Sequence, residues 1–292
     1  MTSKYPDHIV LIKGAGDLAT GVAARLYRCG FVVVMTERPN PLMVRRSVSF
    51  GEAVYATQVE VEGILAWHAS DLRAVHLVLD QGNIPVVVDP QADCKAELLP
   101  TVLVDAIMAK SNLNTRITDA PCVVALGPGF TAGVDCHAVI ETNRGHSLGR
   151  VIYTGSAEPD TGQPGSVDGK TEERILLSPV QGVVVSLATI GDRVTEGQTV
   201  AQVSGRPVYT QTAGILRGLI HSGICIPAGT KIGDVDPRAE PAQCQQISDK
   251  AYAIAGGVLE AVLRAGILPT RLSLLPESLT DWEEQTLRAY NG

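Results

Sequence analysis

Two glycines near the start of the chain have the spacing of a turn that binds a phosphate-bearing ligand. Residues 9–21 read IVLIKGAGDLATG, an apolar run followed by a glycine-rich turn and a helix-like stretch that starts near Asp17. Gly14 permits a tight turn, Gly16 lets a ligand approach the backbone, and the small Ala19 lets the helix lie close to the strand. The pattern is the looser G-x-G-x-x-A form of the dinucleotide fingerprint, and the free N–H groups of the helix start would face an anion.

Charged residues after the next apolar run extend this prediction. Glu37 ends the run FVVVMTE, about 20 positions further on, where a ribose-binding carboxylate is expected. Arg45 and Arg46 can clamp a phosphate, or they can be solvated charges. Glu37 favours an NAD-like ligand, whereas Arg38 and the two later arginines leave a 2′-phosphate open. Asp17 would repel a pyrophosphate, and it is also a good helix N-cap with no ligand at all.

A histidine and a carboxylate share one face of a predicted strand over residues 137–141. His137 and Glu141 could act as a general acid–base pair or as two metal ligands. They could equally form a hydrogen-bonded pair that orders a loop. A third ligand is not in register with them, so the sequence predicts no metal site.

Two further segments suit an anion. Gly127 and Gly129, in LGPGF, follow an apolar run and resemble a loop whose backbone N–H groups form a concave anion site. Arg144, in the polar turn NRGH, offers a planar fork for an oxyanion or a phosphate. A rigid turn without a ligand and a solvent-exposed turn are the respective alternatives.

The elements that must position these residues alternate between strand and helix. Unbroken Val/Ile/Leu runs are typical of parallel strands buried on both faces, and helices between them predict a doubly wound, Rossmann-like sheet. The apolar runs cover 8–13, 31–36, 84–88 and 101–106, and the helical patterns cover 17–29 and 70–82. Asp89 and Asp105 follow predicted strands at the edge where such sheets bind ligands, or they are loop and cap residues.

An internal repeat at an offset of 32 residues lies within 174–238. Three glycines recur in each half between apolar positions, which marks turns between short strands. Two such halves interlock as a flattened barrel that resembles the biotinyl/lipoyl-type barrel-sandwich hybrid. Those carrier domains present a lysine on the connection between halves, and the connection here, SGRPVYT at 204–210, has none. The repeat is therefore predicted to be a structural or docking module.

Four segments follow from these patterns. We expect a Rossmann-like α/β domain over 1–120 and a glycine-rich strand-and-loop segment over 121–173 that completes the ligand pocket. The all-β barrel-sandwich hybrid covers 174–238, and a C-terminal helical segment covers 239–292. Within the last segment, apolar residues at helical spacing over 245–266 predict a helix that packs on the α/β domain, and a short helix is expected around 278–290.

Composition narrows the classes of function. The 292 residues are 45% apolar and 19% charged, with a net charge of −7 and no basic block, which argues against nucleic-acid or membrane partners. Six scattered cysteines without a C-x-x-C pair favour a reducing cytoplasm. The start of the chain has no signal-peptide pattern, so a cytoplasmic location is expected.

Five motifs in order carry a family resemblance: GAGDLATG at 14–21, VRRSVSFGEAVY at 44–55, LGPGFTAG at 126–133, HAVIETNRGH at 137–146 and GSAEPDTGQPG at 155–165. Together they are similar to the YqeB-type accessory proteins of selenium-dependent molybdenum hydroxylases. The resemblance implies a cytoplasmic accessory protein that helps to mature a hydroxylase of the xanthine dehydrogenase type, through its molybdenum cofactor and labile selenium. It assigns no catalytic residue.

Three functions therefore stay open. The first is an accessory protein that holds a nucleotide, an NAD(P) or a molybdopterin-dinucleotide type ligand. The second is an NAD(P)-dependent oxidoreductase, and the third is a non-catalytic scaffold with an empty Rossmann-like domain.

Overall fold

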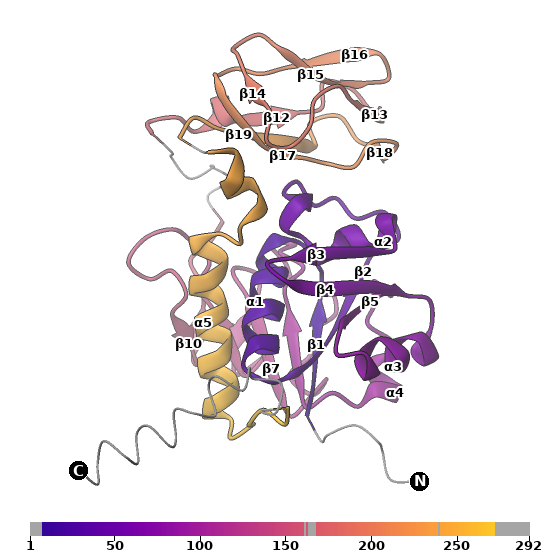
Figure 1. Ribbon diagram of the computed structural model, residues 1–292. Helices are drawn as coiled ribbons and strands as arrows, with labels where there is room; N and C mark the ends of the chain where they lie inside the picture. Colours follow the sequence, from indigo (N-terminus) through magenta and orange to yellow (C-terminus); the bar gives the residue numbers. More distant parts are fainter. Residues whose placement is uncertain (1–7, 161, 163–167, 239, 272–292) are drawn as a thin grey trace, which may run out of the picture.

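The computed structural model describes residues 8–160, 162, 168–238 and 240–271. It contains a sheet with helices on both faces and, above one end of that sheet, an antiparallel β-module formed by residues 175–236 (Figure 1). The alternating apolar runs predict the mainly parallel sheet, and the internal repeat predicts the antiparallel β segment; the two antiparallel edge strands make the large sheet mixed. The short helix expected around 278–290 lies outside the described residues.

Within the described part of the chain, nine strands form the large sheet in the order β10-β9-β7-β6-β1-β2-β5-β4-β3. The seven central strands are parallel and pair in the register that this order requires: β1 (Ile9–Lys13), β2 (Val32–Glu37), β4 (Ile64–Ala69), β5 (Ile84–Val88), β6 (Val102–Asp105), β7 (Cys122–Leu126) and β9 (Ala138–Ile140). The edge strands β3 (Gln58–Val61) and β10 (Val151–Ile152) are antiparallel.

The chain changes direction across the sheet at β1. The connection through α1 (Asp17–Arg28) places β2 on one side of β1, and the later strand β6 pairs on its other side. Such a switch opens a crevice at the carboxyl ends of the strands, where α/β proteins bind ligands. The glycine-rich turn lies at this point.

Helices cover both faces of the sheet. α1 and α5 (Asp249–Arg264) pack on one face, with Val10 and Ile12 of β1 in the same core. On the other face, α3 (Leu72–Asp80) and α4 (Lys95–Leu98) pack over Ile9 and Leu11. The helix expected over 245–266 is thus confirmed and packs on the sheet as predicted; the preceding residues form the 3₁₀ helix η4 (Pro241–Gln245).

Helices α1 and α5 lie side by side and parallel, with both N-termini toward the β-module (Figure 1). Gly21 of α1 permits the close approach, because a Cβ there would lie 2.7 Å from the Cβ of Ala251 on α5. Ser248 caps α5 by accepting a hydrogen bond from the Ala251 N–H at 3.2 Å. The N-termini of both helices therefore lie on the side of the sheet that faces the β-module.

The β-module contains two four-stranded antiparallel sheets within the described residues. One has the order β12-β19-β17-β14 and the other β16-β15-β13-β18. Their strands are β12 (Ile175–Leu177), β13 (Gly182–Ser186), β14 (Arg193–Val194), β15 (Thr199–Val203), β16 (Arg206–Tyr209), β17 (Gly214–Leu219), β18 (Cys225–Ile226) and β19 (Lys231–Asp236).

The internal repeat is confirmed in the backbone. Gly191 and Gly223 have φ angles of 103° and 91°, and Gly197 and Gly229 have 78° and 76°. The halves interlock as expected, because β14 of the first half pairs with β17 of the second and β18 of the second pairs with β13 of the first.

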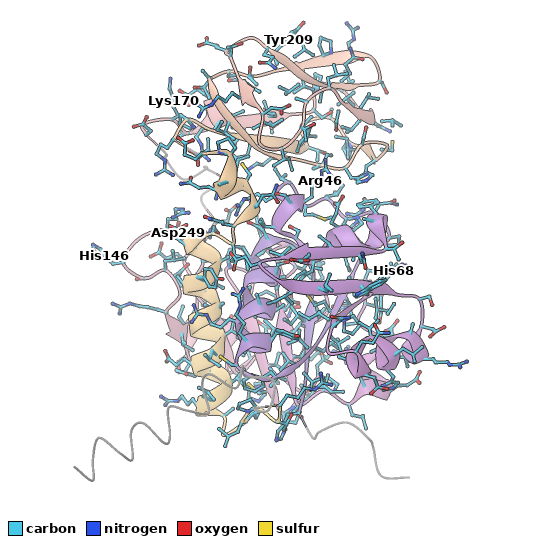
Figure 2. The ribbon with its side chains drawn as sticks, viewed as in Figure 1. Arg46, His68, His146, Lys170, Tyr209 and Asp249 are labelled. Carbon is cyan, nitrogen blue, oxygen red and sulfur yellow. The ribbon has the colours of Figure 1, made fainter. Side chains whose placement is uncertain are left out.

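Arg46 joins the β-module to the rest of the molecule, at the junction seen in Figure 2. Its Nε donates to the Leu219 carbonyl at 3.1 Å, and its Nη1 donates to Oε1 of Glu52 at 3.2 Å. The rings of Tyr55 and His221 stack beside it with centroids 4.1 Å apart. These polar and aromatic contacts hold the module over the carboxyl ends of the strands.

The described residues of the segment 121–169 supply further strands and loops near that edge. It contains β7, β9 and β10 and a small antiparallel pair, β8 (Thr131–Ala132) with β11 (Gly155–Ser156). The other short elements are η1 (Arg46–Val48), η2 (Phe50–Glu52), α2 (Ala53–Ala56) and η3 (Glu172–Arg174). None of the described helices is long and apolar enough to cross a bilayer.

Candidate functional site

The glycine-rich turn has the geometry that its sequence predicts. Gly14 has a φ of +91°, and a Cβ there would lie 3.0 Å from the Ala106 carbonyl oxygen, so the position requires glycine. Gly16 precedes α1 with a φ of −70°, and a Cβ there would meet nothing within 4 Å. The backbone at Gly16 therefore faces open space that a ligand can enter.

Glu37 closes one side of this turn. Its Oε2 accepts a hydrogen bond from the Ala15 N–H at 2.9 Å, and its Oε1 accepts one from the Arg38 N–H at 2.8 Å. Burial raises the pKa of Glu37, although these hydrogen bonds and the Arg38 charge act in the opposite direction. The carboxylate accepts the hydrogen bond of the Ala15 amide. It does not engage the amides of the first turn of α1, which have no partner inside the helix.

A cavity of about 720 Å³, here called the glycine cavity, opens beside the turn at the carboxyl ends of β1, β2, β5 and β6. Its walls combine the turn with polar and apolar side chains: Gly14, Gly16, Asp17, Leu18, Ala19, Thr36, Glu37, Arg38, Pro39, Leu42, Met43, Pro90, Gln91, Ala106, Ile107, Met108 and Leu113. The structure thus brings together Gly14, Gly16 and Glu37, as the sequence predicts.

A second cavity, here called the charged cleft, measures about 880 Å³ and lies between the strand ends and the β-module. Asp17, Leu18 and Met108 line both cavities, so the two adjoin at the start of α1. Eight basic side chains line the charged cleft: Arg45, Lys110, Arg144, Arg174, Arg217, Lys231, Arg238 and Lys250. Six carboxylates line it as well: Asp17, Glu158, Asp160, Asp234, Asp236 and Asp249.

Arg45 is the most deeply buried of the predicted phosphate ligands, with 7% of its surface exposed. Its Nη2 donates to the Gln246 carbonyl at 3.0 Å, and its Nη1 lies 3.7 Å from Oδ2 of Asp17. Among the described residues, Nε and Nη1 have no hydrogen-bond partner. Burial lowers the pKa of Arg45, and the positive charge of Arg217 lowers it further.

The two adjacent arginines diverge. Arg46 is absent from the lining of the charged cleft and instead joins Leu219 and Glu52 at the junction with the β-module. Its predicted role as a phosphate ligand is therefore corrected to a structural one. The short η1 helix begins at Arg46, so the two arginines lie on either side of its start.

Of the other predicted anion ligands, Arg144 lines the charged cleft, whereas Gly127 and Gly129 line neither cavity. Arg144 forms a two-pronged ion pair with Asp249, at 3.0 and 3.1 Å, which holds the pKa of Asp249 at about 2. The Gly127 N–H donates to the Ile140 carbonyl at 2.9 Å and is not free for an anion. Gly127 and Gly129 serve close packing instead, because a Cβ on Gly129 would lie 2.6 Å from the Cα of Ser111.

His137 and Glu141 do not form the expected acid–base pair. They flank opposite ends of β9, where the rise of a strand separates residues four apart by about 13 Å. The His137 Nδ1 accepts the Val123 N–H at 2.9 Å, and the buried Glu141 accepts the backbone N–H groups of Asn143 and Glu158 at 2.7 and 2.8 Å. Each side chain accepts hydrogen bonds from the backbone, so these contacts give both residues a structural role.

A buried network beneath the two cavities was missed. Lys13 Nζ lies 3.3 Å from Oδ2 of Asp105 and donates to Thr115 at 2.6 Å and to Asn114 at 2.5 Å. Thr115 in turn donates to Asp105. Two sequence signals point to this network: Lys13 ends an otherwise apolar strand, and Asp105 follows another strand at the same edge of the sheet.

Among the described residues, no group of three or more His, Cys, Asp or Glu side chains is placed to hold a metal ion. The Cys136 thiol beside His137 is fully buried, which raises its pKa to about 12. A thiol in that state is unreactive as a nucleophile.

The fold defines a mixed, mainly parallel α/β protein with an appended antiparallel β-module. The chain is similar to the uncharacterized protein YqeB of Escherichia coli strain K12, with 48% identity over 255 residues. The match covers 87% of this chain and 47% of that protein, so the chain spans about half the length of this relative. No family model matches the chain.

Likeness to solved structures is slight. An aspartoacylase family protein from Mesorhizobium loti is 13% identical, with 80% of this chain and 87% of that chain covered and a TM-score of 0.27. The ectoine utilization protein EutE (DoeB) from Ruegeria pomeroyi is 11% identical, with 78% and 85% covered and a TM-score of 0.24. TM-scores this low carry no argument about fold or chemistry.

Proposed function

We propose that this chain binds a nucleotide-type ligand in the glycine cavity through a Rossmann-like α/β domain. One observation carries the proposal: the start of α1 opens into a cavity that also contains the Glu37 carboxylate. The first-turn amides and the positive end of the helix dipole favour a diphosphate. Glu37 is at the position where an acidic residue accepts hydrogen bonds from ribose hydroxyls.

The walls of the cavity suit the rest of a nucleotide. Leu42, Met43, Ile107 and Leu113 give an apolar lining for a heterocyclic base. The Asp17 carboxylate at the start of α1 opposes a diphosphate, and it lies 3.7 Å from Arg45, which offsets its charge. A neutralised Asp17 at the boundary of the two cavities leaves the amide of Gly16 accessible.

We further propose that the chain is an accessory protein in the maturation of a selenium-dependent molybdenum hydroxylase of the xanthine dehydrogenase type. The five ordered motifs support this role, and a molybdopterin dinucleotide is a ligand of the class that the glycine cavity suits. The β-module is proposed to be a barrel-sandwich hybrid that docks a partner. Its lysine-free connection at 204–210 does not support a carrier function.

A thermal-shift titration tests ligand binding. A ligand that binds only the folded state adds about 2.7 kcal/mol of stability at a hundredfold excess over its dissociation constant. Nucleoside diphosphates, NAD(H), NADP(H) and molybdopterin dinucleotides are the panel. We expect a concentration-dependent rise in melting temperature with at least one of them, and silence from the whole panel would refute the proposal and favour the scaffold.

Two valine variants localise the site. Gly16→Val places methyl groups in the open space above the turn and should abolish the shift. Gly256→Val is the matched control, because Gly256 also has open space around its Cβ position but lies on α5 and lines neither cavity. If the rise in melting temperature persists in Gly16→Val, the ligand does not bind at this turn.

The maturation role has its own test. The hydroxylase would be produced in cells with the wild-type chain, with Gly16→Val or with neither, and its molybdenum and selenium contents measured. We expect the wild type alone to give a fully loaded hydroxylase. Equal loading in all three would contradict the accessory role, and turnover of a small substrate with NAD(P) would favour the oxidoreductase.

A further inference from the structure

We propose that the charged cleft contains a second anion subsite, formed by Arg45 and Arg217, which takes a phosphate or pyrophosphate group. This subsite goes beyond the glycine cavity and does not require that cavity to be occupied. Its two arginines come from different parts of the molecule, since Arg45 follows β2 and Arg217 is on β17 of the β-module.

The first argument is the unsatisfied state of Arg45. Two of its guanidinium nitrogens are buried without a hydrogen-bond partner among the described residues, and its nearest carboxylate, Asp17, stands at 3.7 Å. A buried donor without an acceptor is costly, and more so when it carries charge. An anion at Arg45 would supply the missing acceptor atoms.

The second argument is the proximity of a second positive charge. Arg217 lies on the same cleft, and the charges of the two arginines interact unfavourably. Its own carboxylate neighbours, Asp234 and Asp236, are each 3.8 Å away, beyond hydrogen-bond distance. Two guanidinium groups that repel each other across a cavity are stabilised by an anion that both can contact.

The carboxylates of the cleft do not fill this role, because most are engaged elsewhere. Asp234 forms a two-pronged pair with Arg174 at 3.2 Å, and Asp249 forms one with Arg144. Asp160 pairs with Lys110 at 2.6 Å.

Asp236 accepts the backbone N–H of Arg238 at 2.9 Å, and its carboxylate lies 3.5 Å from the Arg238 Nε. Of the two remaining carboxylates, Glu158 accepts a hydrogen bond from the Asn143 side chain at 2.5 Å, and Asp17 lies 3.7 Å from Arg45 Nη1. Among the described residues, Lys231 and Lys250 then have no ion-pair partner, and the carboxylates nearest to Arg45 and Arg217 stay beyond hydrogen-bond distance, at 3.7 and 3.8 Å.

The third argument is the field of the two parallel helices. α1 and α5 both direct their N-termini at the cleft, where Leu18 and Ser248 line it. The positive ends of the two helix dipoles add there, and Lys250 in the first turn of α5 lines the same wall. Burial lowers the pKa of Lys250 and Arg144 lowers it further, while the carboxylates of Asp17, Glu141 and Asp249 act in the opposite direction.

The placement has a mechanical consequence. An anion held by Arg45 and Arg217 contacts both the α/β part and the β-module, so binding would hold the module at the charged cleft. The two cavities adjoin at Asp17, which lets one pyrophosphate-linked ligand reach both subsites.

Calorimetric titration of the full chain with inorganic pyrophosphate and with phosphate tests the subsite. We expect binding that weakens about tenfold or more in Arg45→Met and in Arg217→Met. Arg193→Met is the control, because Arg193 is an exposed β-module arginine outside the cleft, and its affinity should equal that of the wild type. Circular dichroism checks that each variant is folded. If Arg45→Met does not fold, the affinity of Arg217→Met alone decides the test.

The failures of the two proposals are distinguishable. Loss of pyrophosphate binding in Gly16→Val, with Arg45→Met and Arg217→Met unchanged, would place the anion at the glycine turn and overturn the subsite alone. Absence of any heat from wild-type chain at millimolar pyrophosphate would also overturn it. Pyrophosphate binding lost in both arginine variants and kept in Gly16→Val supports it, whatever the nucleotide panel gives.

Discussion

Lys13 offers a sharp test of how the sequence builds the walls of both cavities. Its side chain is 2% exposed and its ion-pair partner Asp105 is 3% exposed, at the carboxyl ends of β1 and β6. Through Asn114 and Thr115, Lys13 also ties down the loop that follows β6. That loop supplies Met108, Lys110 and Leu113 to the cavities, so Lys13 acts as a positioning residue for them.

Lys13→Met keeps the length of the side chain and removes its charge. Removing one partner of a buried ion pair leaves the other charge uncompensated, at a cost of about 3–5 kcal/mol. Asp105 keeps hydrogen bonds from Thr115 and from the Ile107 N–H, so we expect the lower end, about 3 kcal/mol. Adding Asp105→Asn removes the orphaned charge and should recover part of the loss.

Urea denaturation followed by circular dichroism measures these free energies of unfolding. The double-mutant cycle of the Lys13 and Asp105 substitutions should give an interaction energy above about 1 kcal/mol. Hydrogen exchange should show the loop after β6 opening faster in Lys13→Met, and nucleotide affinity should fall with it. A loss below about 1 kcal/mol together with additive single effects would refute the reasoning that a buried pair positions this loop.

Three more predictions follow from the geometry of the turn and the junction. Gly14→Ala should cost about 1–3 kcal/mol of stability because of its positive φ, whereas Gly16→Ala should cost at most about 1 kcal/mol, both read from urea midpoints; equal losses would contradict this. Arg46→Met should cost about 2 kcal/mol and split calorimetric unfolding into two transitions as the β-module detaches; one unshifted transition would count against the junction. Burial places the folded-state pKa of Glu37 above its unfolded value of about 4.3, so ionising Glu37 opposes folding. Stability is therefore lost as the pH rises from the unfolded pKa through the folded-state pKa. Ribose hydroxyls need the ionised form, so nucleotide-induced stabilisation should grow over the same pH window and lose that dependence in Glu37→Gln.

Much of the local structure could be predicted from short-range patterns. The run at 9–13 is buried on both faces, as unbroken apolar strands are in parallel sheets, and the helix after Asp17 begins where the glycine-rich turn ends. The repeat over 182–236 predicts the two halves of the β-module, because glycines at equal offsets adopt similar positive φ angles. These signals depend on neighbouring or regularly spaced residues, so they can be recognised in a single sequence.

The site is harder to predict because its pairings join distant residues. Arg45 and Arg46 look equivalent in the sequence, yet Arg45 lines the charged cleft and Arg46 donates to the Leu219 carbonyl. Arg217 approaches Arg45 only after the β-module folds over the sheet. Glu141 has the residue type of a catalytic base, but its partners are two backbone amides that no spacing rule predicts.

A crystal structure of the chain grown with ADP, GDP, CDP or UDP tests the central claim most directly. The account predicts a diphosphate within hydrogen-bond distance of the Gly16, Asp17 and Leu18 amides and a ribose against Glu37. An empty glycine cavity at saturating concentrations of all four, or nucleotide density elsewhere on the protein, would contradict it.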